Sequence, residues 1–170
     1  MRSRIRTWLL LVSGLLSLSA ATAQEIVPPI DPIEGTWQTL LLSAVTIAPC
    51  PEGFCGTLSK IVVPEGTLSE ADAAAAAQMN PEDFFDQRNK DPALRSRPML
   101  GLQILTLVPS DKPNIYDGEI YNPEDGNTYS GYLELVTADM VRLNGCVLFN
   151  VICRGEDWVR APVVEDEAAQ

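Results

Sequence analysis

The sequence predicts a mainly β domain, an antiparallel up-and-down β-barrel of about seven to eight strands with a short α-helical insertion. Short runs rich in Val, Ile, Leu, Thr and Tyr are separated by turn residues over residues 35–161. The last four runs are joined by hairpin-length loops. Closing such a meander removes its exposed edges, which favours a barrel over the alternative of a two-sheet sandwich.

Seven segments carry the strand pattern. The clearest is 115–121, where residues 116, 118 and 120 alternate with residues 117, 119 and 121 as in a half-buried antiparallel strand. A turn at 123–126 follows it, because Gly126 can take a positive φ. The seven predicted strands are 37–47, 54–63, 100–108, 115–121, 128–136, 140–147 and 153–160.

A helical insertion interrupts the strands. Ser69 stands three residues before Asp72, which resembles a capping box, and five alanines follow at 73–77. We therefore expect a helix over residues 70–79. Pro81 can open a second short turn through Phe84 and Phe85.

The two ends of the chain are expected to lie outside the barrel. Three arginines precede an apolar run at 8–21, and Ala21-Thr22-Ala23 supplies the small residues of a cleavage site, so residues 1–23 are predicted to be a cleavable signal peptide. This run is short for a membrane span, and we expect a periplasmic or secreted protein with no stable membrane anchor after cleavage. The proline-rich segment 24–34 is predicted to be a linker, and 162–170 a disordered acidic tail.

Composition excludes several functions. The chain has no histidine, which removes Ser/His/Asp and Cys/His catalysis and the commonest nitrogen ligand of zinc. It has 23 acidic against 12 basic residues, a net charge of −11. Proteins bind the phosphates of nucleic acids with many lysines and arginines. Because this chain is strongly acidic, we expect no nucleic-acid partner.

The four cysteines form two close pairs, Cys50 with Cys55 and Cys146 with Cys153. In an oxidising compartment paired thiols become disulfides. Four cysteines allow three connectivities, and we favour the two local pairs. A four-cysteine zinc site is the weaker alternative, because the two pairs do not both have the short spacing of two to four residues that zinc sites use. We expect no metal and no cofactor.

Two charge clusters flank residue 87. Glu82, Asp83 and Asp86 precede it, and this acidic cluster is typical of a solvated surface, so we assign no catalytic residue. A cation cluster follows: Arg88, Lys90, Arg95 and Arg97. Its arginines could hold an anionic group with their planar forks, or could instead brace Asp86 or another nearby acid.

Several phrases together resemble the bacterial exported family known as domain of unknown function 2147. The resemblance spans about residues 35–160 and implies a small secreted or periplasmic β-rich domain without an established activity. The phrases, in order, are Gly35-Thr-Trp37, Phe54-Cys55-Gly56, residues 86–92, residues 94–102, residues 120–129, Gly145-Cys146 and Trp158-Val-Arg160.

A second, weaker resemblance is to the calycins, the lipocalin-like barrels. There a Gly-x-Trp on the first strand meets an arginine on the last strand, and the tryptophan closes one barrel end. In this chain those residues are Trp37 and Arg160, with Trp158 as a second core tryptophan. We therefore expect Arg160 or Arg154 to stack on a Trp37 that is buried near one barrel end.

The sequence favours a non-enzymatic barrel that binds a small apolar or anionic ligand. A barrel of about eight strands is either filled by side chains or holds one small ligand. Arg95 and Arg97 are the candidate polar end of the site, and Tyr116 and Tyr132 are candidate wall residues. Three glycines expected on strands, Gly101, Gly118 and Gly131, argue for interior space.

Two other functions stay open. The first is an envelope module with a filled barrel that has a structural role or binds another envelope protein. A carboxylate-based hydrolase is the least favoured, because no acid/base pair stands out.

Overall fold

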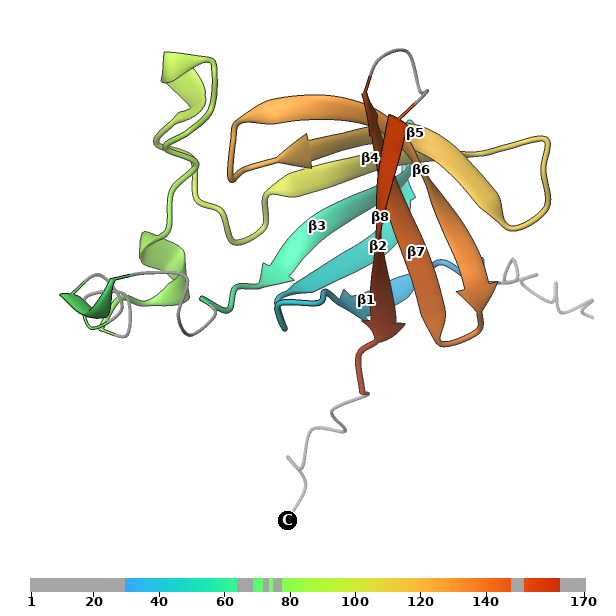
Figure 1. The fold of residues 1–170 in the computed structure, drawn as a ribbon, viewed down its shortest axis with the longest axis horizontal. Helices are drawn as coiled ribbons and strands as arrows, with labels where there is room; N and C mark the ends of the chain where they lie inside the picture. The colour runs from blue at the N-terminus through green and yellow to red at the C-terminus, as the bar shows by residue number, and fades with distance from the viewer. Residues whose placement is uncertain (1–29, 64–68, 72–73, 75–77, 148–151, 163–170) are drawn as a thin grey trace, which may run out of the picture.

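The barrel is closed, and its strands follow one another around it in chain order until β8 returns to β1 (Figure 1). The computed structural model describes residues 30–63, 69–71, 74, 78–147 and 152–162. The predicted fold class is confirmed, whereas the signal peptide 1–23 lies outside the described residues. Every pair of neighbouring strands is antiparallel: β1 (Gly35–Gln38), β2 (Ala44–Cys50), β3 (Gly53–Lys60), β4 (Gln103–Pro109), β5 (Ile115–Asn122), β6 (Asn127–Thr137), β7 (Met140–Val147) and β8 (Ile152–Arg160).

The predicted single strand 37–47 is wrong, because the chain reverses within it. Thr39 N–H donates to the Ser43 carbonyl at 2.8 Å, and β1 pairs with β2 across this turn. Leu42 takes a φ of 67°, a region that leucine rarely adopts. The turn residues 39–43 contain no glycine, proline, asparagine or aspartate, and Ser43 alone is a weak turn signal.

Gly101 is not on a strand either. It lies in a turn with a φ of 80°, and its N–H donates to the Leu58 carbonyl at 2.7 Å. Strand β4 begins two residues later than Gly101, at Gln103. The conformation that only glycine adopts easily therefore explains this residue without any interior space.

Side chains fill the barrel. Phe54 packs edge-on against Tyr116 with ring centroids 5.8 Å apart, at the margin of the core. Burying this much apolar surface is the main stabilising contribution to such a domain. The core residues are Ile33, Trp37, Val45, Ile47, Leu58, Leu105, Leu107, Tyr116, Leu133, Val141, Leu143 and Trp158.

Ile33 corrects the expectation that the segment 24–34 stays out of the core. Its side chain is fully buried, and its carbonyl accepts a hydrogen bond from Trp37 Nε1 at 2.8 Å. The last residues of the predicted linker therefore plug one barrel end. Residues 24–29 lie outside the described residues.

Three glycines lie side by side across β5, β6 and β7, because Gly118 pairs with Gly131 and Gly131 pairs with Gly145. A Cβ on Gly118 would lie 1.9 Å from the Thr106 carbonyl oxygen, and one on Gly131 would lie 2.2 Å from that of Asn144. Gly118 and Gly131 thus allow neighbouring backbones to approach closely where the sheet curls. Because the neighbouring backbone occupies this position, neither glycine leaves interior room for a ligand.

The barrel end that carries Ile33 is closed by a stack of two side chains. The Arg160 guanidinium carbon lies 4.1 Å from the centre of the Trp37 ring, the contact expected from the sequence. Its nitrogens donate to the carbonyls of Pro32 at 2.8 Å and Glu34 at 3.0 Å. The first and last strands are joined here, so the closed end holds the barrel together.

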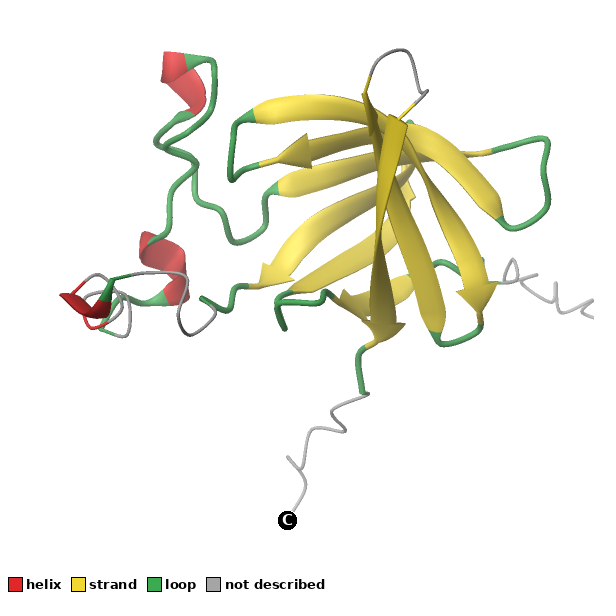
Figure 2. Cartoon of the chain, viewed as in Figure 1, coloured by secondary structure: helices red, strands yellow, loops and turns green. Residues whose placement is uncertain are grey.

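The connection from β3 to β4 carries the only helical residues in the described parts of the chain (Figure 2). Residues 70, 71 and 74 of the predicted helix are helical, and 72–73 and 75–77 lie outside the description. Two 3-10 turns follow, η1 (Pro81–Asp83) and η2 (Pro92–Leu94). Within the described residues no helix is long and apolar enough to cross a membrane.

Candidate functional site

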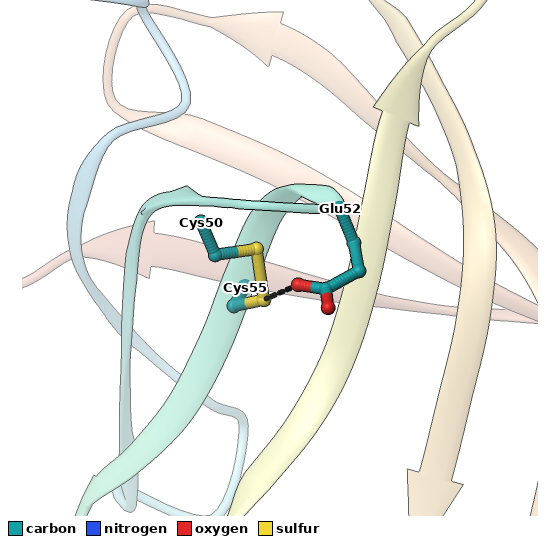
Figure 3. A group of neighbouring side chains, drawn as sticks. All are labelled: Cys50, Glu52 and Cys55. Atoms are coloured by element: carbon teal, nitrogen blue, oxygen red, sulfur yellow. Dashed lines mark hydrogen bonds between the residues drawn. A yellow bond between two sulfur atoms is a disulfide. The ribbon is translucent and has the colours of Figure 1, made fainter.

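The two predicted disulfides are present in the structure. Cys50 is bonded to Cys55 across the β2–β3 hairpin, and Cys146 to Cys153 between register partners of β7 and β8. Glu52 Oε2 lies 3.9 Å from Cys55 Sγ (Figure 3). Because both sulfurs of this group are in a disulfide, they are not thiolates and this trio is not a metal site.

The four residues predicted to bind a ligand do not converge. Tyr116 is in the core near the closed end, where its hydroxyl donates to Asp31 at 2.7 Å. Burial, followed by this hydrogen bond, raises the pKa of Tyr116 well above its usual value. Tyr132 corrects the prediction of an inward side chain: its neighbour Leu133 is fully buried in the barrel, so Tyr132 points to the opposite, outer face of β6.

The two arginines lie on a compact loop, residues 84–99, which we call the clamp loop. Its two ends run antiparallel: Phe85 bridges to Pro98, and Asp86 N–H donates to the Arg97 carbonyl at 3.1 Å. Its middle turns at η2, where Asp91 accepts from Ala93 N–H at 2.9 Å. This short ladder places the side chains of Asp86 and Arg97 together.

Asp86 is the centre of a buried polar cluster that joins the clamp loop to β5. Its carboxylate accepts from Tyr121 Oη at 2.6 Å, from Asn89 Nδ2 at 2.9 Å and from Arg97 Nε at 2.9 Å. The side chain of Asp86 is fully buried, whereas that of Arg97 is about one-third exposed. A buried carboxylate is stable only with such partners.

The environment of Asp86 keeps it ionised. Burial is the largest influence and alone would raise the pKa of this carboxyl, but hydrogen bonds from Tyr121, Asn89 and Arg97 together outweigh it and hold the pKa below its usual value. The Tyr121 hydroxyl shifts the other way: burial first, and then the bond to Asp86, raise its pKa. The cluster is therefore one carboxylate held by three neighbouring side chains.

Both predicted anion-binding arginines have protein partners. Arg97 pairs with Asp86 and lies over the ring of Tyr121, 5.1 Å from its centre. Arg95 Nε donates to the Asn89 carbonyl at 2.8 Å, within the clamp loop itself. The geometry favours the interpretation left open above, that these arginines brace the loop.

The clamp loop is also tied to the β5–β6 turn. Arg88 donates from its guanidinium to the Glu124 carbonyl at 2.6 Å, and Asn89 donates to Tyr121 Oη at 2.9 Å. A Cβ on Gly126, whose φ is 69°, would lie 1.9 Å from the Arg88 carbonyl oxygen. The loop therefore docks against the end of β5 at Tyr121 and against the β5–β6 turn.

A groove of about 230 Å³ opens beside the docked loop. Thr106 and Glu119 are register partners on β4 and β5, and Tyr121 and Thr128 are partners on β5 and β6, so all four project from the outer face. Gln103 Nε2 donates to Thr106 Oγ1 at 3.0 Å. The lining residues are Arg97, Gln103, Ile104, Thr106, Glu119, Tyr121 and Thr128.

Sequence reasoning found one of these lining residues, Arg97, and missed the rest. The alternating pattern of 115–121 had placed Glu119 and Tyr121 on one face of a strand, and that face proves to be the outer one. A search of outer strand faces next to the cation cluster would have found the groove. The clamp loop contributes Arg97 to the lining, and no local sequence pattern predicts where this loop docks.

The comparisons with known proteins bear on the family and the fold. Residues 35–160 match the profile of an uncharacterised protein family conserved in bacteria, DUF2147. The chain belongs to the DUF2147 family. The match covers every strand of the barrel and the whole clamp loop, as the resemblance in the sequence implied.

One solved structure shares the fold of this DUF2147 chain. It is protein HP1028 from Helicobacter pylori, whose description assigns it to the lipocalin family. The two chains superpose with a TM-score of 0.59 at 20% sequence identity, over 77% of this chain and 84% of that one. The lipocalin-like fold is thus shown. No curated protein matches the DUF2147 chain.

Proposed function

We propose that this chain is an exported, non-enzymatic binding protein that holds a small, neutral, hydroxyl-rich ligand of the saccharide class in the groove beside the clamp loop. The observation that carries the proposal is the lining of that groove. Hydroxyl, amide, carboxylate and guanidinium groups surround one aromatic ring and one aliphatic side chain. Such a set has both donors and acceptors at fixed positions.

The match to a hydroxylated ligand follows from hydrogen-bond chemistry. Each ligand hydroxyl can donate to Glu119 and can accept from the Gln103 amide or a threonine hydroxyl. Ile104 and the exposed part of Tyr121 offer apolar surface for the C–H face of a sugar ring. Neither a purely apolar ligand nor a bare ion would use this combination.

Charge favours a neutral ligand over an anionic one. Arg97 is already neutralised by Asp86, and Glu119 adds a negative charge that no described residue pairs with. The whole chain carries a charge of −11, which repels anions at longer range. An anionic ligand would have to displace the Asp86 contact, which is buried and supported by Tyr121 and Asn89.

The outer groove is favoured over the barrel interior because the interior is occupied. Leu107, Leu133 and Val141, which lie on three different strands, are each fully buried. A ligand of drug size needs several hundred Å³ of enclosed space, so it would require these side chains to move.

An oxidising, extracytoplasmic location supports the same proposal. The two disulfides would be reduced in the cytosol, and the N-terminal charge and hydropathy pattern is that of a signal peptide. A periplasmic protein of this kind meets saccharides from the cell envelope and from outside the cell.

The proposal is tested by titrating the mature protein with glucose, N-acetylglucosamine and glucuronate and following backbone amide shifts by NMR. Glucose and N-acetylglucosamine are expected to bind with saturable shifts, and glucuronate more weakly. Glu119→Gln and Thr128→Val should each weaken binding by about tenfold, since each removes one hydrogen-bonding partner.

Asp117→Asn is the matched control, because Asp117 lies on the same outer face of β5 but does not line the groove. It should bind as the parent does. Absence of saturable binding to either neutral sugar, or tighter binding of glucuronate, would contradict the proposal.

An envelope module with a filled barrel is the second candidate. The packed interior favours it as much as it favours an outer groove. The two differ in the titration above, since a pure interaction module would show no saturable response to sugars.

A further inference from the structure

The barrel seam between β1 and β8 is paired over only part of its length. β1 has four residues and β8 has nine, and the two strands pair only at Trp37 with Arg160 and at Gln38 with Val159. Figure 1 shows β1 beside the lower end of β8 alone. Within the described residues, the stretch 152–158 therefore has β7 on one side and no strand on the other.

The backbone of this stretch alternates between its two sides. Arg160 N–H donates to the Asp139 carbonyl, on the β7 side, whereas Ala161 N–H donates to the Thr36 carbonyl, on the β1 side. Backbone groups of successive strand residues point to opposite sides, so Gly155 and Asp157 direct theirs toward the open side. Gly155 has no side chain that could block an approaching strand.

Exposed apolar side chains lie next to this edge. Leu40 N–H donates to Glu156 Oε1 at 2.9 Å, which brings the β1–β2 turn against β8. Leu40 is 73% exposed, and Leu41 and Leu42 are also exposed. Ile152, at the start of β8, is 56% exposed. An unpaired sheet edge beside exposed leucines is a surface that a partner strand can cover.

We infer that the open edge of β8 pairs with the same edge of a second copy of this chain, antiparallel and centred on Gly155. A two-fold axis through Gly155 makes the interface isologous, so the same strand segment is used twice. The two Gly155 residues would then exchange both backbone hydrogen bonds. The leucine turns of both copies would become covered at the same time.

The charges of β8 select this partner and this register. In an antiparallel pair centred on Gly155, Arg154 of each copy lies opposite Glu156 of the other, which gives two opposite-charge pairs. Arg154 makes no hydrogen bond or ion pair with any described residue, so it is available for this contact. A strand of uniform charge would lack this complementarity.

The test is sedimentation velocity on the mature protein over micromolar to millimolar concentrations. The parent protein should form a dimer whose population rises with concentration. Arg154→Glu should raise the dimer dissociation constant by at least about tenfold, because it places two carboxylates opposite one another in each pair. Glu156→Arg alone should do the same with two cations.

Mixing the two variants is the decisive step. An Arg154→Glu chain and a Glu156→Arg chain restore both opposite-charge pairs when they meet, so the mixture should dimerise although neither variant does alone. Lys112→Glu is the control: Lys112 lies in the β4–β5 loop, away from β8, and this charge reversal should leave the dimer intact.

A monomeric parent protein at all concentrations would overturn the inference, and so would a mixture that stays monomeric while the parent dimerises. Circular dichroism shows whether each variant is folded. Arg154 makes no hydrogen bond or ion pair with a described residue. The result for Arg154→Glu therefore decides the question even where Glu156→Arg, which loses hydrogen bonds from Leu40 N–H and Trp158 Nε1, fails to fold.

Discussion

Single residues decide how the closed end of the barrel is held. Arg160 contributes a charge to the Trp37 ring and donors to three backbone carbonyls, those of Pro32, Glu34 and Ala138. Lysine has the same charge, but its ammonium is a point donor without the planar fork. The geometry of the guanidinium, and not its charge alone, therefore explains why an arginine stands here.

Arg160→Lys should lower the free energy of unfolding by about 2 kcal/mol, because part of this carbonyl cluster loses its donors. Urea denaturation followed by tryptophan fluorescence measures the change. Arg154→Lys is the control, since the Arg154 side chain makes no hydrogen bond or ion pair with a described residue, and it should be neutral. Equal stability of both variants would contradict the role of the fork.

Asp86 is the second residue whose environment sets a measurable property. Its pKa in the folded protein lies below that of the unfolded chain, because Tyr121, Asn89 and Arg97 stabilise the carboxylate against the effect of burial. The resulting stabilisation is fully present above the ordinary carboxyl pKa and is lost as the pH falls through the lower, folded value.

Asp86→Asn should therefore destabilise the protein at pH 7 by about 1–3 kcal/mol, and this difference should shrink below about pH 4. Urea denaturation at both pH values gives the comparison. Asp117→Asn, an exposed carboxylate on the same sheet, should change little at either pH. A difference that is the same at both pH values would show that Asp86 acts through shape and not through charge.

At the scale of strands, close backbone approach limits which glycines can be replaced. A Cβ at Gly118 would meet the Thr106 carbonyl, whereas the nearest atom to a Cβ at Gly145 is Ile120 Cδ1, at 3.8 Å. Gly118→Ala should cost about 1–3 kcal/mol through overpacking. Gly145→Ala should be close to neutral. Thermal melts of the two variants test this. Equal melting temperatures would contradict the close approach of the Thr106 backbone to Gly118.

The disulfides staple neighbouring strands. They span sequence separations of 5 and 7 residues, and loops of this size predict a stabilisation of about 2 kcal/mol each through the unfolded chain. Replacing both cysteines of one pair by serine should lower stability by that amount without abolishing folding. Denaturant curves of the two double variants provide the measurement, and loss of all cooperative unfolding in either would contradict a purely stapling role.

Local patterns predicted most strands because alternation and turn residues are local. The segment 115–121 shows this best: its inward and outward sets match the burial of Tyr116 and the exposure of Glu119. The failure at 37–47 has an equally local cause. The turn through Thr39 and Leu42 depends on the β1–β2 pairing, which holds Leu42 at a positive φ. The residue types in this turn do not reveal such a pairing.

At the scale of the whole molecule, the candidate site could not be read from the sequence because it is assembled from four separate segments. Arg97 comes from the clamp loop, Thr106 from β4, Glu119 from β5 and Thr128 from β6. Their proximity depends on barrel closure and on the docking of the clamp loop through Asp86. The sequence did indicate that the cation cluster has an acidic partner, and Arg97 with Asp86 is that pair.

The position of the groove in this chain differs from the position of the ligand site that a lipocalin-like barrel can offer. Lipocalin-type barrels of about eight strands can hold one small ligand inside. In this chain the interior carries Trp37, Tyr116 and Trp158, and the shaped polar surface lies on the outer wall. We therefore propose that this chain binds its ligand on the outer wall of a filled barrel.

The most direct test is a backbone-amide NMR map of the mature protein in the presence of glucose and, separately, of dodecanoate. We predict saturable glucose shifts confined to residues 97, 103–106, 119–121 and 128, and no saturable shift at core residues with dodecanoate. Saturable dodecanoate shifts at Leu107, Leu133 and Val141, which face the interior, would show that the barrel opens for an apolar ligand and would contradict the claim.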